Sequence, residues 1–248
     1  MKLFLLLSAL VLLTLLSGSP GFSGVSDNLK DGEKAQASLQ EAETAFSQSN
    51  FEEAIRAYRQ TLQARPNLPQ AHYGLGLALA RLGRYEEAAR AFREALQHKP
   101  KWAQAHRDLG VVYLKLKRWP EAARAFQTSL EQQPQNAETY YNLGVAEGKE
   151  GKHQEAREAF AKALRIKPDY VQALNNLGMA NIKLNRWEEA KRSFEKALSL
   201  KADSPEAHLG LLACHIKQGD SQAAARTYQT LAKLDQGLAR KADELLGR

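Results

Sequence analysis

The side chains that could carry out chemistry do not form a catalytic pattern. The sequence contains no G-x-S-x-G, H-E-x-x-H or G-x-x-x-x-G-K-[ST] segment, the patterns that present a nucleophile, a zinc ion or a phosphate-binding loop. The adjacent residues Cys214 and His215 would point in different directions on a helix and form a poor pair of nucleophile and base. We therefore predict that the chain is not an enzyme and needs no cofactor.

A recurring set of basic residues is a better candidate for binding. The set returns every 34 residues and consists of Arg81, Lys115, Lys149, Lys183 and Lys217. One interpretation is a basic stripe that attracts an acidic peptide or another polyanion. The alternative is that these cations stand near helix C-termini, where positive charge favours the helix dipole. Both interpretations stay open from the sequence.

The same spacing runs through most of the chain. Prolines align at 66, 100, 134 and 168, so each repeat can be numbered from 1 to 34 with this proline at position 32. Position 20 is always alanine, position 24 is always Phe or Tyr, and position 28 is mostly leucine. Residues four apart lie on one face of a helix. A Leu-Gly pair at positions 7 and 8 of the four inner repeats predicts a partner helix that is approached closely at the glycine.

These columns resemble the tetratricopeptide repeat (TPR) family. The resemblance covers six tandem units, at residues 35–68, 69–102, 103–136, 137–170, 171–204 and 205–238. It implies an all-α fold, an α-α superhelix (TPR solenoid) of about six helix pairs, with helix A near positions 1–14 and helix B near positions 17–30. The end units depart from the pattern, as expected where a repeat has only one neighbour. Apolar residues on one face of 239–248 predict a C-terminal capping helix.

The N-terminus predicts export. Residues 3–16 are apolar except for Ser8 and Thr14 and are followed by small residues, which is typical of a secretory signal and short for a spanning helix. We expect a signal peptide at 1–21, cleavage after Gly21, a flexible linker at 22–34 and a periplasmic or secreted location. The alternative is an uncleaved anchor, residues 3–25, as the only contact with a membrane.

By resemblance, ligands lie in the concave groove lined by helix A. The corresponding residues are Tyr73, Arg81, Arg107, Asp108, Lys115, Tyr141, Asn142, Lys149, Asn175, Asn176 and Lys183. Asn142 and Asn176 occupy position 6 of adjacent units, where relatives in the family hold the backbone of an extended peptide; an amide suits this because it both donates and accepts hydrogen bonds. Gly74, Asp108 and Gly210 interrupt the column.

Other partners are less favoured. His72, His106 and His208 share position 4, but neighbouring copies would lie about 8–10 Å apart or more, too far to share a zinc ion that needs nitrogens at about 2 Å. The net charge is +7, but most aromatic residues belong to packing columns, so no nucleic acid is expected.

We therefore predict a protein-protein interaction scaffold or adaptor that binds a peptide segment or helix during cell-envelope assembly. The alternatives are an accessory subunit that recruits an envelope enzyme, and a self-assembling, homo-oligomeric TPR protein.

Overall fold

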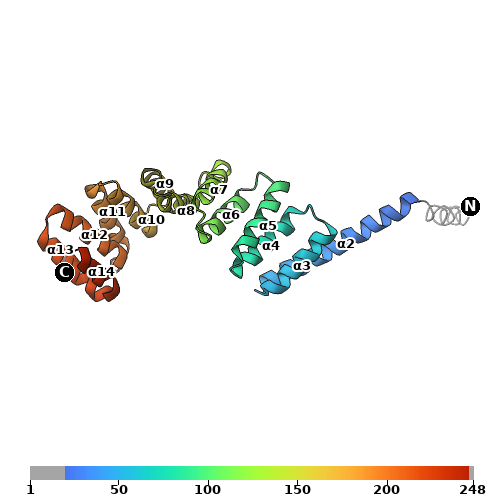
Figure 1. Ribbon diagram of the computed structural model, residues 1–248, viewed down its shortest axis with the longest axis horizontal. Coiled ribbons are helices and arrows are strands. Elements are labelled where there is room, and N and C mark those ends of the chain that lie inside the picture. The colour runs from blue at the N-terminus through green and yellow to red at the C-terminus, as the bar shows by residue number, and fades with distance from the viewer. Residues whose placement is uncertain (1–19, 246–248) are drawn as a thin grey trace, which may run out of the picture. The chain divides into compact units, whose positions relative to one another are not determined.

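The computed structural model describes residues 20–245, which contain helices and no strand (Figure 1). The chain divides into two compact units, one ending at Pro100 and one beginning at Lys101. The first unit holds α2 (Pro20–Ser47), α3 (Phe51–Ala64), α4 (Pro69–Arg81) and α5 (Tyr85–His98). The second holds α6 (Ala103–Lys115), α7 (Trp119–Gln132), α8 (Ala137–Lys149), α9 (His153–Ile166), α10 (Val171–Lys183), α11 (Trp187–Leu200), α12 (Pro205–Gln218), α13 (Ser221–Leu234) and α14 (Gln236–Leu245).

The predicted all-α arrangement of helix pairs is confirmed. Each helix A packs on the helix B that follows it, and within a unit each helix B also packs on the next helix A. Every helix B begins at position 17 and ends at position 30 of its repeat. The alanines of position 20 are fully buried in the first five repeats and nearly so in the sixth, because only a methyl group fits where the helices meet.

A phenylalanine ring against a glycine is the central contact of each inner repeat. A Cβ atom added to Gly76, Gly110, Gly144 or Gly178 would lie within 2.5–2.8 Å of the phenylalanine ring of the same repeat. The glycine was expected to let two backbones approach closely, and the structure shows that the space is filled by this ring, one of Phe92, Phe126, Phe160 and Phe194.

The two end repeats lack this glycine, and their aromatic residues at position 24 contact other helices. In the first repeat Ala42 stands at position 8, and the ring of Tyr58 lies against Gly74 of the next repeat. In the last repeat Leu212 stands there, and the Tyr228 hydroxyl donates a hydrogen bond to Asp243 Oδ1 on α14 at 2.7 Å. The Phe194 ring lies against both Gly178 of its own repeat and Gly210 of the next repeat, so a ring at position 24 can pack on either neighbouring helix A.

The turn between helix A and helix B has one conformation in all six repeats. The residue at position 15 has a positive φ whether it is glycine or not: the values are 64° at Ser49, 73° at Gly83, 58° at Lys117, 86° at Gly151, 59° at Asn185 and 75° at Gly219. The two inner turns without glycine are thus closed in the same left-handed conformation, which costs more for a residue with a side chain.

The N-terminal part differs from the expectation of a flexible linker. Residues 22–34 belong to α2, a helix of 28 residues that continues into the first repeat. Adding residues to an existing helix is far easier than starting one, and Pro20 stands at the helix start, where proline is tolerated. The predicted signal peptide lies almost wholly outside the described residues. None of the helices within residues 20–245 is long and apolar enough to cross a membrane.

The C-terminal helix begins three residues earlier than the 239–248 expected. The Asp235 side chain accepts a hydrogen bond from the Leu238 backbone N–H at 2.9 Å, which is the contact of a helix N-cap. Ala239 and Ala242 are buried against Leu212 of α12 and Leu231 of α13. This helix covers the apolar surface of the last repeat, as the sequence predicts.

A pair of substitutions on α8 tests the contact between ring and glycine. We expect Gly144→Ala to lower the free energy of unfolding by about 1–3 kcal/mol, because the new methyl group overlaps the Phe160 ring. Gly148→Ala is the control one turn away, where a new Cβ meets only Ala156 Cβ at 3.7 Å; it should be neutral or stabilising, since alanine favours a helix by up to about 1 kcal/mol. Urea unfolding followed by circular dichroism measures both, and equal effects would contradict the assignment.

The strained turn at Lys117 gives a second test. Lys117→Gly should raise the free energy of unfolding by about 0.5–1 kcal/mol, because glycine adopts the positive φ without a steric cost. Gly83→Ala, which introduces the opposite change in the equivalent turn, should lower it by a similar amount. Thermal unfolding reports both shifts. A lower melting temperature for Lys117→Gly would show that the lysine side chain contributes more than its backbone conformation costs.

Candidate functional site

A hollow of the second unit runs along the A helices α8, α10 and α12. It consists of a cavity of about 300 Å³ bordered by α8, α9 and α10, and one of about 870 Å³ bordered mainly by α10 and α12. The two share Asn176, Met179 and Lys183, so they form one continuous groove. We call it the α8–α10–α12 groove; its lining includes Tyr141, Val145, Lys149, Asn175, Asn176, Met179, Lys183 and Leu209.

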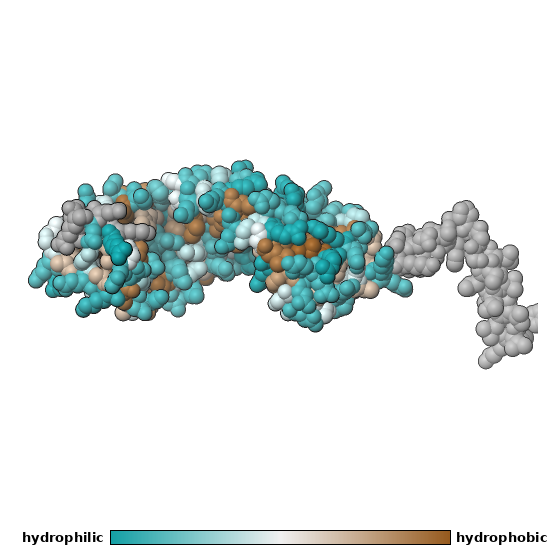
Figure 2. Space-filling view, turned by 60° about the horizontal axis from the view of Figure 1, so that its bottom comes forward, coloured by the Kyte–Doolittle hydropathy of each residue, from teal (hydrophilic) through white to brown (hydrophobic). Residues whose placement is uncertain are grey.

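The centre of the groove offers exposed apolar surface. The Met179 side chain stands between the two cavities and is 45% exposed, which is unusual for a large apolar residue in this chain. Val145 and Leu209 continue the apolar lining towards the two ends. Figure 2 shows one face of the molecule, which is mainly hydrophilic with separate hydrophobic patches. Concave apolar surface with a few polar groups is the usual composition of a binding site.

Two neighbouring asparagines supply the polar groups. Asn176 Nδ2 donates a hydrogen bond to the Tyr141 hydroxyl at 3.2 Å, and Asn175 Nδ2 donates to Ser204 Oγ at 3.3 Å. The Asn175 Oδ1 atom is buried and accepts no hydrogen bond within the described residues. Leaving a buried acceptor unpaired costs about 1–3 kcal/mol, and because this oxygen is closed to solvent, it is a cost of the local packing.

Tyr141 is held in place by aromatic neighbours. Its ring lies 5.0 Å from that of Tyr170 and 5.9 Å from that of Phe160, both centroid to centroid. Burial raises the pKa of the Tyr141 hydroxyl above its usual value, so the group remains a neutral phenol at physiological pH. The tyrosine therefore fixes Asn176 in a rigid aromatic setting, with the Asn176 carbonyl oxygen left to accept from a ligand.

The structure brings together only part of the predicted site. Five of the eleven residues line the groove, namely Tyr141, Lys149, Asn175, Asn176 and Lys183. Asn142 is half-buried and lines neither cavity. Arg107 Nε and Asp108 Oδ1 form an ion pair with each other at 3.1 Å, and Lys115 is exposed.

The remaining two predicted residues lie in the first unit. The Tyr73 ring packs on Phe92 with 5.6 Å between centroids, and Arg81 is exposed in the last turn of α4. In the structure, Tyr73 therefore contributes to packing within its own repeat.

The basic residues of position 13 are all exposed. Arg81, Lys115, Lys149, Lys183 and Lys217 each lie in the last turn of a helix A, where a cation favours the helix dipole. Only Lys149 and Lys183 also line the groove. The Lys217 ammonium instead lies 5.7 Å from the centroid of the Trp187 ring. The dipole explanation thus fits all five residues, and the binding explanation fits two.

Histidine and cysteine side chains have structural contacts. Nε2 of His72 lies 2.7 Å from the Pro66 carbonyl oxygen, and Nε2 of His208 lies 3.0 Å from that of Ala202, so each histidine ties its helix to the preceding loop. Cys214 is fully buried, and burial raises the pKa of its thiol to about 11. Because the thiolate is the reactive form, this cysteine is a packing residue.

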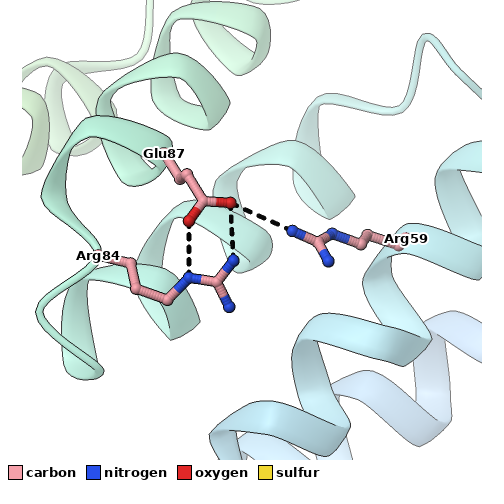
Figure 3. A network of polar contacts seen from close by, with 3 residues as sticks. All are labelled: Arg59, Arg84 and Glu87. Carbon is pink, nitrogen blue, oxygen red and sulfur yellow. Dashed lines mark hydrogen bonds and ion pairs between the residues drawn. The ribbon is translucent and has the colours of Figure 1, made fainter.

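Charged residues at the start of helix B also join repeats. Figure 3 shows Glu87 accepting two hydrogen bonds from Arg84, both at 2.7 Å, and one from Arg59 of α3 at 3.3 Å. The hydrogen bond from Arg84 is the main reason that the pKa of the Glu87 carboxyl is lowered. Glu87 stands in the first turn of α5, where negative charge favours the helix dipole, and its contact with Arg59 also joins α3 to α5.

A column of buried polar residues was missed in the sequence. Position 11 of helix A holds Glu147, Asn181 and His215 in the last three repeats, all buried, and each has a polar atom without a hydrogen-bond partner in the described part of the chain. The same column is apolar or aromatic at Leu79 and Tyr113. A change from apolar to polar within one column is the signal that could have revealed them.

Glu147 has the most perturbed carboxyl group of the column. Burial raises its pKa to about 7, with further increases from Glu155 and Glu150 and opposing effects from Lys152 and Lys162. Since the folded-state pKa exceeds the reference value of 4.5, the folded chain binds more protons between these pH values. The free energy of unfolding therefore falls as the pH rises from about 4.5 to about 7 and changes no further above that.

Replacing Glu147 tests this pH dependence. Glu147→Gln keeps the shape without the charge, and we expect it to raise the free energy of unfolding at pH 8 by about 1–3 kcal/mol and to flatten the profile between pH 5 and pH 7. Glu94→Gln removes an equal charge from an exposed position of α5 and should leave the profile unchanged. Urea unfolding at several pH values provides the comparison. Parallel profiles for the Glu147 variant and the wild type would contradict the expectation.

Comparisons with known proteins agree with this architecture. Residues 15–245 match the family model of the cilia and flagella-associated protein 70 C-terminal domain, a TPR domain. No curated protein matches the chain in a sequence search. Among solved structures, MamA from Desulfovibrio magneticus RS-1 is 27% identical with a TM-score of 0.65, and the match covers 69% of this chain and 97% of MamA.

Two further structures share the fold at lower identity. PilF of Pseudomonas aeruginosa is 19% identical with a TM-score of 0.68, and the match covers 87% of this chain and 99% of PilF. YrrB, described as a TPR protein with an unusual peptide-binding site, is 23% identical with a TM-score of 0.68, covering 81% of this chain and 98% of YrrB. The repeats, the helix pairs and the match over residues 15–245 together show that the chain is a TPR protein and belongs to the family of the cilia and flagella-associated protein 70 C-terminal domain.

Proposed function

We propose that this chain is a non-catalytic scaffold that binds an extended segment of a partner protein in the α8–α10–α12 groove. The TPR fold and its structural neighbours support a protein-interaction scaffold in general. The observation that carries the specific proposal is the Asn176 side chain, whose nitrogen is bound to Tyr141 and whose carbonyl oxygen is left free, beside the exposed Met179 side chain. An oxygen without a donor and an apolar surface without a cover are complementary to the backbone and one side chain of a peptide.

The free acceptor favours an extended ligand over a helical one. Asn176 directs its amide nitrogen to Tyr141, so its carbonyl oxygen is the atom left for a ligand. In an extended strand the backbone N–H groups are free to donate, whereas those in the interior of a helix are already used. The groove is also preformed by rigid helices, so binding would cost this chain little conformational entropy.

Positive charge lies at one side of the groove. Lys149 and Lys183 are both exposed and line the same cavity, and no acidic side chain lines it with them. Acidic residues of the partner would therefore be attracted to the helix-terminal side of the groove, while an apolar residue covers Met179. The groove would therefore prefer a short peptide segment in which an apolar residue, packed on Met179, is followed or preceded by an acidic residue.

A selected peptide tests the groove. A random peptide library displayed on phage would be enriched on residues 22–248, and the binding of an enriched peptide measured by fluorescence polarisation. Asn176→Ala should weaken binding about three- to tenfold through loss of a polar anchor, and Met179→Glu by more than about tenfold, since it places a charge against an apolar side chain. Asn142→Ala is the matched control, with the same substitution in the same column outside the groove.

The result can exclude the groove as well as support it. Equal affinity for all variants, with circular dichroism showing that each is folded, would place the binding surface elsewhere. Weakening by Asn142→Ala alone would favour the original asparagine column over the groove. Enriched peptides without an apolar residue would contradict the role given to Met179.

We also propose that the protein acts in the cell envelope after export. The support is the apolar run at residues 3–16 followed by small residues. Expression of the full chain with a C-terminal tag in bacteria, followed by fractionation and N-terminal sequencing, tests this. A mature chain beginning at Phe22 in the periplasm is expected; an intact chain beginning at Met1 in the cytoplasm would contradict export.

A further inference from the structure

A second hollow of the second unit differs from the groove in its chemistry. It has a volume of about 460 Å³, is bordered by α7, α8 and α9, and shares no lining residue with the α8–α10–α12 groove. We call it the acidic cleft and define it by Glu131, Tyr140, Glu147, Glu155, Glu158 and Lys162. Its four carboxyl groups come from three different helices, so acidic side chains reach the cleft from α7, α8 and α9.

The charges of the cleft are not neutralised within it. Its single cation, Lys162, places its ammonium 5.6 Å from the centroid of the Tyr140 ring and forms no ion pair with a carboxylate of the described residues. Glu158 Oε1 accepts a hydrogen bond from the neutral amide of Gln154 at 2.7 Å. Glu131 and Glu155 are exposed and have no ion-pair partner in residues 20–245.

Glu147 adds an observation that solvated surface acids do not provide. Its residue is only 6% exposed, it lines the cleft, and its Oε2 atom has no hydrogen-bond donor in the described part of the chain. Burying a carboxylate without a donor is costly. The raised pKa of the Glu147 carboxyl, about 7, has the same cause, because burial disfavours the ionised form more than nearby groups favour it.

An organic cation fits this arrangement better than a metal ion. No three acidic, histidine or cysteine side chains among the described residues are grouped closely enough to hold a metal. A guanidinium or ammonium group, by contrast, can donate several hydrogen bonds to separated oxygens and can also lie over an aromatic ring. The Lys162 ammonium already has this relation to the Tyr140 ring, so the ring stands where a cation can contact it. A ligand cation would take the place of the exposed Lys162 side chain.

We propose that the acidic cleft binds the cationic side chain of an arginine or lysine of a partner protein, with Glu147 as its innermost acceptor and the Tyr140 ring as one wall. Glu131, Glu155 and Glu158 attract the cation to the entrance. The chain thereby has two separate recognition elements within one unit, an apolar groove with basic residues at one side and an acidic cleft for a basic side chain.

Nuclear magnetic resonance titration of isotope-labelled residues 22–248 tests the cleft with small probes. The probes are N-acetyl-arginine methylamide, N-acetyl-lysine methylamide and, as the neutral control, N-acetyl-glutamine methylamide. We expect saturable shifts of backbone amide signals from α7, α8 and α9, including those of Tyr140 and Glu147, with at least one cationic probe and none with the neutral one. Comparison of the two cationic probes shows whether a guanidinium or an ammonium group is preferred.

Three variants separate the cleft from general surface charge. Glu147→Gln should weaken the cationic probe about tenfold, as expected for loss of a charge-assisted hydrogen bond. The double variant Glu131→Gln, Glu155→Gln changes only exposed side chains, so it tests the entrance without disturbing the core, and it should also weaken binding. Glu94→Gln, on α5 of the first unit, should leave the affinity unchanged.

Two outcomes would overturn the proposal. Shifts that spread over the whole surface without saturation would show only screening of a charged protein. Saturable shifts at α7, α8 and α9 that remain unchanged in both the Glu147 variant and the double variant would show that these carboxylates are not the acceptors. Neither result bears on peptide binding at the α8–α10–α12 groove, which is tested by different variants.

Discussion

The contact between an aromatic ring at position 24 and a glycine at position 8 is the constraint on which the other features depend. The ring occupies the volume that a side chain at position 8 would take. The spacing of helix A and helix B in an inner repeat therefore depends on glycine at position 8 and an aromatic ring at position 24. Tight packing of this kind leaves little room for adjustment, because protein interiors are as dense as organic crystals. Helix A is thereby held rigidly, and the polar side chains that it presents to the groove are held with it.

Much of the architecture was accessible from the sequence, because packing repeats in the same columns as the residues. Position 20 predicts a helix contact through a methyl group and position 24 predicts the ring, and both are found in each repeat. The left-handed conformation of the turns at Lys117 and Asn185 could not be predicted, since a sequence does not report φ. The helical state of residues 22–34 was not predicted, because glycine and serine disfavour a helix locally while the continuation of a neighbouring helix favours it.

The candidate site could be predicted only in part, for a different reason. Family resemblance supplied positions on helix A, but a groove also needs neighbours on both sides, and the repeats differ in what those neighbours contribute. Asn176 meets Tyr141 and lines both cavities, whereas Asn142, in the same column, lines neither. The sequence shows only that Glu147 is a polar residue in a column that is otherwise partly apolar. Its burial and the missing hydrogen-bond donor can be recognised only in the structure.

The glycines at position 6 have a consequence for the length of ligand that can be held. Gly74 and Gly210 appeared in the sequence as interruptions of the asparagine column, yet a Cβ at either would lie 2.2–2.3 Å from the ring of the preceding repeat, Tyr58 or Phe194. Asparagine could be introduced there only by moving a core aromatic side chain. The core therefore excludes an amide at these two positions, whereas Asp108, the third interruption, already carries a side chain. A recognition site that extended past Gly74 or Gly210 would need additional inner repeats.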